Sequence, residues 1–197
     1  MRKYFSDDSI YISADHGNMN GYNGKYCYGF DVYTQNIGIP LITPRIDDMT
    51  VCDEYISNID IKQIILDHRI PKRKFIYSDT QYYAQPKRKL AIIHNDFLYI
   101  YNKKNKTEEL YDLKYDRALR CNMFYDTFYD VDRELKTYTR ELFFSPRWDE
   151  AIKIRDVFTN EKNRIWKEAP VFESFMESSR MLAKKKVVKT IKILKKR

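Results

Sequence analysis

The feature of this sequence that most limits its fold is the placement of its glycines. Four of the five glycines lie between residues 17 and 29, directly after a short apolar run, Ser9–Ser13, and the pair Asp15-His16. Such a glycine-rich stretch predicts an irregular loop. The apolar run predicts a short buried strand. The sequence therefore predicts a strand that delivers Asp15 and His16 to the start of a long loop, where functional sites are commonly built.

The middle of the chain has the pattern of an antiparallel sheet. Segments 90–94 and 97–101 flank Asn95-Asp96, a dipeptide typical of two-residue hairpin turns. We therefore expect a β-hairpin here. Further strands are predicted at 37–42, 73–78 and 108–113, with Pro40 placing the first of these at a sheet edge or in an irregular segment.

Apolar residues at helical spacing predict a helix before the hairpin, and further helices are predicted after the last strand. Ile61, Ile64 and Ile65 mark the first, with Asn58 as its expected N-cap. Pro146 separates the later ones. The predicted helices span 58–67, 126–142, 147–162 and 171–196. This order of elements predicts a mixed α/β chain with a partial sheet, an antiparallel meander and a helical end.

The positive charge of the chain is concentrated at its carboxyl end. The net charge is +8, and residues 181–197 hold eight lysines and arginines and no acid. The other 180 residues carry 28 basic and 28 acidic side chains, so we expect no nucleic-acid binding by the folded body. Apolar residues share one helical face of this tail with lysines around them. That pattern fits either an anionic membrane surface or a solvated helix packed on the body.

Three cysteines, Cys27, Cys52 and Cys121, have no metal-site spacing, and their odd number argues against a disulfide scaffold. No apolar stretch is long enough for a membrane span, and the first residues lack the apolar core of a signal peptide. A cytoplasmic location is therefore the expectation for the chain as written.

Asp15-His16-Gly17 is the sharpest chemical signal. A carboxylate and an imidazole side by side can share one divalent cation, and Gly17 lets the chain turn away from it. The alternative is an N-cap aspartate beside a surface histidine. The apolar run before the motif and the glycine-rich loop after it favour the metal site.

The segment Ser9–Gly17 resembles the strand and metal-binding turn of the sulfatases, and Asp15–Asn18 is also similar to a turn of cofactor-independent phosphoglycerate mutase, a relative in the alkaline-phosphatase superfamily. Four later segments resemble sulfatase segments in the same order. They are 33–42, ending in Ile-Pro-Leu-Ile; the helix over 57–66; the hairpin over 89–101; and Glu108–Leu113, reading Glu-Glu-Leu-Tyr-Asp-Leu, with Asp116 and Asn122 after it.

This resemblance implies the carboxyl-terminal part of a sulfatase/alkaline-phosphatase-like α/β fold over 1–123, followed by a helical extension over 124–180 and the basic amphipathic tail over 181–197. It implies Asp15 and His16 as ligands of calcium, magnesium or manganese. It also implies sulfate or phosphate ester substrates, including esters of glycans. The family nucleophile motif, Cys/Ser-x-Pro-x-Arg, is not found in this sequence.

Two functions follow from the resemblance. The chain either hydrolyses or transfers an ester when completed by the missing amino-terminal half, or it is a non-catalytic remnant or binding module. Either way we expect dependence on that half, on self-association, or on repacking of the helices after Asp126 over the exposed face of the sheet. Tyr28 stands where the family has an ester-binding histidine. Lys25 either replaces that histidine as a substrate-binding charge or is a solvated loop lysine.

Overall fold

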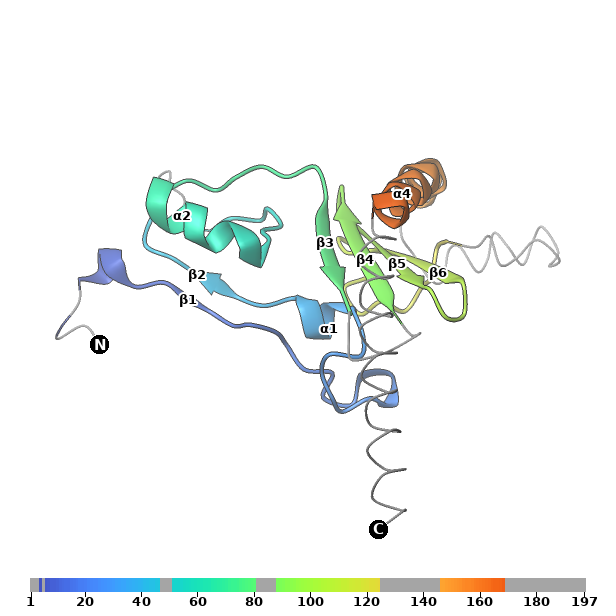
Figure 1. Ribbon diagram of the computed structural model, residues 1–197, viewed down its shortest axis with the longest axis horizontal. Coiled ribbons are helices and arrows are strands. Elements are labelled where there is room, and N and C mark those ends of the chain that lie inside the picture. Colours follow the sequence, from blue (N-terminus) through green and yellow to red (C-terminus); the bar gives the residue numbers. More distant parts are fainter. Residues whose placement is uncertain (1–3, 5, 47–50, 81–87, 125–145, 169–197) are drawn as a thin grey trace, which may run out of the picture.

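The protein is built on a four-stranded antiparallel sheet with strand order β3-β4-β5-β6. The computed structural model describes residues 4, 6–46, 51–80, 88–124 and 146–168. Together these residues form a mixed α/β fold (Figure 1), which is the fold class that the sequence predicts. The strands are β3 (Ile76–Asp79), β4 (Lys89–His94), β5 (Phe97–Asn102) and β6 (Thr107–Asp112).

The hairpin between β4 and β5 has the turn that the sequence predicts. Asn95 and Asp96 both adopt positive φ angles, 49° and 61°, as a two-residue hairpin turn of the right twist requires. His94 pairs with Phe97 beside the turn, and the ladder continues to Lys89 and Asn102. The strands predicted at 108–113 and 73–78 are also found, with shifted ends, as β6 and β3.

Both faces of this sheet are buried, because its side chains alternate between two apolar clusters. On one face, Tyr99 stacks on Phe158 of α4 (Trp148–Glu168) with ring centroids 5.3 Å apart. On the other face, Leu98 and Ile100 pack against Val32 and neighbouring residues of the glycine-rich segment. The sheet thus fixes the loop that follows Asp15-His16 in place.

Helix α4 confirms the helix predicted at 147–162 and extends it to Glu168. Its contact face carries Ala151, Ile154 and Phe158, all buried, at helical spacing. Arg147 fastens its start by bonding to the Asn95 carbonyl. The helices predicted at 126–142 and 171–196, with the basic tail, lie outside the described residues. No helix in the described part of the chain is long and apolar enough to cross a membrane.

The segment before the predicted site forms a small, separate ribbon. Strand β1 (Ile12–Ser13) pairs antiparallel with β2 (Leu41–Ile42), and Ile12 lies opposite Ile42. Ile12 is 51% exposed and Ile42 is 57% exposed. The prediction of a buried strand over 9–13 is therefore wrong, because β2 is the one strand that pairs with β1 in the described structure. The strand predicted at 37–42 shortens to β2, and helix α1 (Thr34–Ile37) forms before it.

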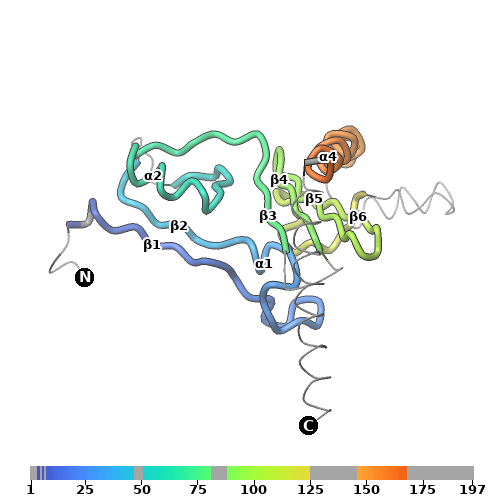
Figure 2. Tube along the Cα trace, viewed as in Figure 1, coloured from blue at the N-terminus to red at the C-terminus, as the bar shows by residue number. Residues whose placement is uncertain are grey.

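Helix α2 (Ile61–Asp67) lies beside this ribbon, away from the four-stranded sheet (Figure 2). The 3-10 turn η3 (Asn58–Asp60) precedes it, so Asn58 begins that turn and is not the N-cap of α2. Ile64 is the buried contact of the helix. The buried Asp60 forms a two-bond ion pair with Arg73, which ties α2 to the chain that leads into β3. Two further 3-10 turns are η1 (Asp7–Ser9) and η2 (Tyr22–Gly24).

Candidate functional site

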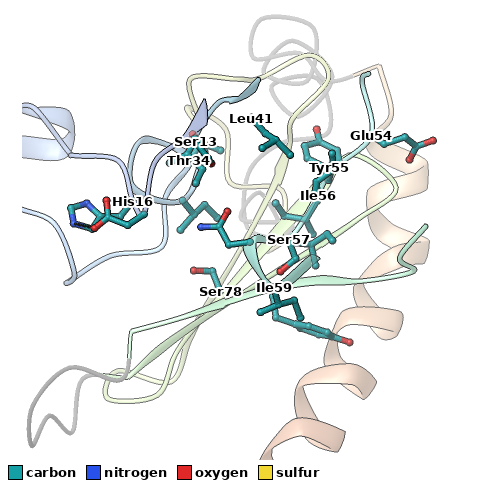
Figure 3. Close-up of a pocket in the computed structure, with 18 of the residues that line it drawn as sticks. Ser13, His16, Thr34, Leu41, Glu54, Tyr55, Ile56, Ser57, Ile59 and Ser78 are labelled. Carbon is teal, nitrogen blue, oxygen red and sulfur yellow. Dashed lines mark hydrogen bonds and ion pairs between the residues drawn. The ribbon is translucent and has the colours of Figure 1, made fainter. Parts of the chain in front are cut away.

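Asp15 and His16 follow β1 and lie in the wall of a pocket of about 1170 Å³. The pocket extends between the β1-β2 ribbon, the segment over 51–59 and strand β3. Figure 3 shows His16 at one side of this pocket and Tyr55 at the other, with Ser13 and Thr34 between them. The volume is large enough for a small organic ligand.

The geometry of His16 leaves one ring nitrogen available for a cation. Its Nδ1 lies 2.8 Å from the Gly17 carbonyl oxygen. A carbonyl can only accept, so Nδ1 carries a proton, and Nε2 has a free lone pair when the ring carries only that proton. Histidine ligands of metals typically donate their other ring N–H to a carbonyl or carboxylate in this way.

The Asp15 carboxylate lies on the same side as this nitrogen. Its Oδ2 is 3.6 Å from His16 Nε2, and its Oδ1 accepts the His16 backbone N–H at 3.0 Å. The side chains of Asp15 and His16 are 88% and 45% exposed, so a hydrated ion can reach both. A carboxylate oxygen and an imidazole nitrogen at this separation can bind one divalent cation together.

These two donors fit a metal site in kind but not in number. Structural and catalytic sites use at least three protein ligands for zinc and six to eight oxygens for calcium. Among the residues that the structure describes, no third His, Cys, Asp or Glu joins Asp15 and His16. Among the described residues, the pair is therefore an incomplete ligand set.

Gly17 holds this pair against α1. Its backbone N–H donates to the Asn36 carbonyl at 2.7 Å. A Cβ at position 17 would lie 2.0 Å from the Gln35 carbonyl oxygen, far inside any real contact. Only glycine permits so close an approach, so the sequence Asp-His-Gly sets the position of both candidate ligands.

Asn36 was not predicted as a site residue, yet it is central to this wall of the pocket. It is 5% exposed, and its Nδ2 donates to the Asp31 carbonyl at 3.0 Å. Its Oδ1 is buried and has no hydrogen-bond partner in the described structure. No local sequence signal marks this residue, because its environment is made by the contact between α1 and Gly17.

Lys25 pairs with a buried carboxylate of the pocket wall. Asp31 accepts hydrogen bonds from both Lys25 and Lys89, and its side chain is 3% exposed. Lys25, at 41% side-chain exposure, also lies 5.3 Å from the centre of the Tyr33 ring. Lys25 thus has a defined structural partner, and its predicted role in binding substrate stays a prediction.

A second carboxylate beside this cluster is bound by tyrosines. Tyr33 donates to Glu109 Oε2 at 3.0 Å, and Tyr111 donates to the same oxygen at 2.7 Å. Burial, reinforced by the Glu109 charge, raises the pKa of both tyrosines well above its usual value. Both hydroxyls therefore stay protonated at neutral pH and serve as donors.

Comparison with known proteins finds solved structures that are similar to part of this chain. No protein-family model matches the chain, and no curated protein sequence matches it. A Bacteroides thetaiotaomicron protein assigned to the sulfatases and a 2-O GAG sulfatase each show 16% identity and a TM-score of 0.49 over 75% of this chain. A protein solved with its substrate D-glucosamine-2-N,6-O-disulfate shows 20% identity and a TM-score of 0.43 over 67%.

The chain spans about a third of the length of these proteins, covering 36%, 36% and 34% of them. Two of the three are described as sulfatases.

Proposed function

We propose that this chain is the carboxyl-terminal part of a sulfatase-like ester hydrolase and supplies Asp15 and His16 to its divalent metal site. The observation that carries the proposal is the arrangement of His16. Its Nδ1 is held by Gly17, which leaves Nε2 free beside the Asp15 carboxylate in a pocket wall. The sulfatase-like order of motifs along the sequence supports the choice of family.

In this proposal each residue has a separate task. Asp15 provides negative charge and a hard oxygen, and His16 provides a neutral nitrogen whose tautomer is already set. Calcium, magnesium or manganese bound there would act as a Lewis acid that polarises a sulfate or phosphate ester. The nucleophile and the remaining ligands would come from a second polypeptide segment.

Exposed apolar side chains support the need for that second segment. Ile12 and Ile42 lie opposite each other on the β1-β2 ribbon, and more than half of each is exposed. Ile59 and Leu66, from η3 and α2, are 75% and 64% exposed. Exposed apolar side chains on this short ribbon and on the neighbouring helix can pack against another polypeptide.

A non-catalytic binding module remains the second candidate function. It is favoured by the incomplete ligand set of the described residues, since two ligands without a nucleophile provide little rate enhancement. Such a module would bind an ester or a partner through the same pocket without turnover.

The test pairs the full chain with an amino-terminal sulfatase segment that carries the nucleophile and the acidic ligands. Hydrolysis of 4-nitrophenyl sulfate and of 4-nitrophenyl phosphate is followed with and without added Mg²⁺, Ca²⁺ or Mn²⁺. The proposal predicts metal-dependent turnover that neither polypeptide shows alone and that Asp15→Asn removes. Asp8→Asn, which changes another exposed carboxylate, is the matched control. Binding of the two polypeptides without turnover would favour the non-catalytic module.

A further inference from the structure

The loop that follows the candidate ligands brings an aromatic side chain back onto one of them. Tyr28 lies twelve residues after His16, yet their ring centroids are 4.1 Å apart and their planes differ by 19°. Gly29, the next residue, has φ of 80°, a conformation that glycine adopts without strain. The glycine-rich loop therefore folds back so that the Tyr28 ring covers one face of the His16 imidazole.

The stacking of Tyr28 restrains a motion of the His16 ring that the hydrogen bond from its Nδ1 does not restrain. The bond from Nδ1 to the Gly17 carbonyl fixes the ring within its own plane. The stacked Tyr28 ring prevents the imidazole from swinging out of that plane. His16 is 45% exposed, so without such contacts its ring would be free to change rotamer in solvent.

We infer that Tyr28 is a positioning residue that holds the His16 ring with Nε2 directed to the side of Asp15, ready to bind a divalent cation. The inference rests on the proposed metal site and adds a residue to it. A ligand held in its binding geometry loses less conformational entropy when the ion binds. The sequence resemblance assigns a histidine to the place of Tyr28, so this tyrosine has a different task here.

The aromatic ring, and not its hydroxyl, makes the contact. Tyr28→Phe should therefore keep the position of His16, whereas Tyr28→Ala should release it. The tyrosine is 55% exposed, so neither change opens a cavity in the core. Tyr115, at 53% exposure on the loop after β6, provides a matched control for loss of an exposed ring.

The first readout needs no metal. The full chain has three histidines, and a His16→Gln variant assigns the ring signals of His16 in its proton NMR spectrum. A stacked aromatic ring shifts those signals upfield. Tyr28→Ala should move them downfield, while Tyr28→Phe and Tyr115→Ala should leave them in place. Unchanged His16 signals in Tyr28→Ala would overturn the stacking contact itself.

The second readout is Mn²⁺ titration, followed by paramagnetic broadening of the same signals. Wild type should show broadening of His16 before His68 and His94, and Tyr28→Ala should require about tenfold more Mn²⁺, the lower end for loss of outer-shell support. Tyr28→Phe should match wild type. No selective broadening in wild type would overturn the metal site and, with it, the role of Tyr28. Equal broadening in wild type and Tyr28→Ala would overturn the role of Tyr28 alone.

Discussion

Replacement of Gly17 by alanine should displace the candidate ligands and destabilise the turn that carries them. The added Cβ would lie 2.0 Å from the Gln35 carbonyl oxygen, whereas real contacts essentially never fall under 3.0 Å. The turn must therefore move about 1 Å away from α1. That shift would lengthen the 2.7 Å bond from the Gly17 N–H to the Asn36 carbonyl beyond hydrogen-bond range.

The expected destabilisation by Gly17→Ala is the sum of three contributions. Loss of the bond costs about 0.5–1.5 kcal/mol, and the residual strain of an overpacked contact costs about 1–3 kcal/mol. The smaller conformational freedom of alanine in the unfolded chain returns about 0.4–1 kcal/mol. We expect Gly17→Ala to lower the free energy of unfolding by about 2 kcal/mol.

Gly24→Ala separates this clash from simple backbone strain. Gly24 has φ of 68°, and a Cβ there would meet nothing within 4 Å. Gly24→Ala should lower the free energy of unfolding by about 1 kcal/mol, because alanine is disfavoured in this left-handed conformation. Urea unfolding followed by circular dichroism gives both costs, and hydrogen exchange at position 17 reports the lost bond. The reasoning is refuted if Gly17→Ala costs no more than Gly24→Ala and the amide at position 17 stays protected.

Three further predictions concern the core and the buried charges. Phe158→Ala should lower the free energy of unfolding by about 3–5 kcal/mol, since it removes a fully buried ring between α4 and the sheet. Urea unfolding followed by tryptophan fluorescence measures this loss, and a loss under about 1 kcal/mol would show that α4 does not pack there. Lys89→Met should lower the free energy of unfolding by about 2 kcal/mol, because the buried Asp31 keeps only Lys25, its more exposed lysine partner. Stability equal to wild type in the same assay would contradict the pairing. The free energy of unfolding should fall as pH rises above about 10. Burial raises the pKa of Tyr111 in the folded chain, so the tyrosine of the unfolded chain loses its proton first. Tyr111→Phe should weaken this pH dependence in urea titrations between pH 8 and 11, and an unchanged dependence would contradict the prediction.

The parts of the fold that could be predicted from sequence are those with local causes. The Asn95-Asp96 turn sets the register of β4 and β5 by its own backbone conformation, so the hairpin is found where expected. Helix α4 is marked by apolar residues at helical spacing, which need only one partner surface. In contrast, the exposure of Ile12 depends on what packs over β1, which the sequence of β1 does not contain.

The same distinction applies to the candidate site. Asp15, His16 and Gly17 form a contiguous motif, and the structure places Asp15 and His16 together in a pocket wall. The pairing of Lys89 with Asp31 joins residues 58 positions apart, and no local pattern indicates it. The stacking of Tyr28 on His16 depends likewise on how the loop folds back, a long-range consequence of its packing on the sheet.

We propose that Asp15 and His16 bind one divalent cation together. Electron paramagnetic resonance of free Mn²⁺ in the presence of the full chain tests this most directly, over concentrations up to the order of millimolar, the weak end for protein sites. We expect one bound Mn²⁺ that is lost in both Asp15→Asn and His16→Gln and kept in Asp8→Asn and His68→Gln. Mn²⁺ binding that survives both Asp15→Asn and His16→Gln, or no binding by wild type, would contradict it.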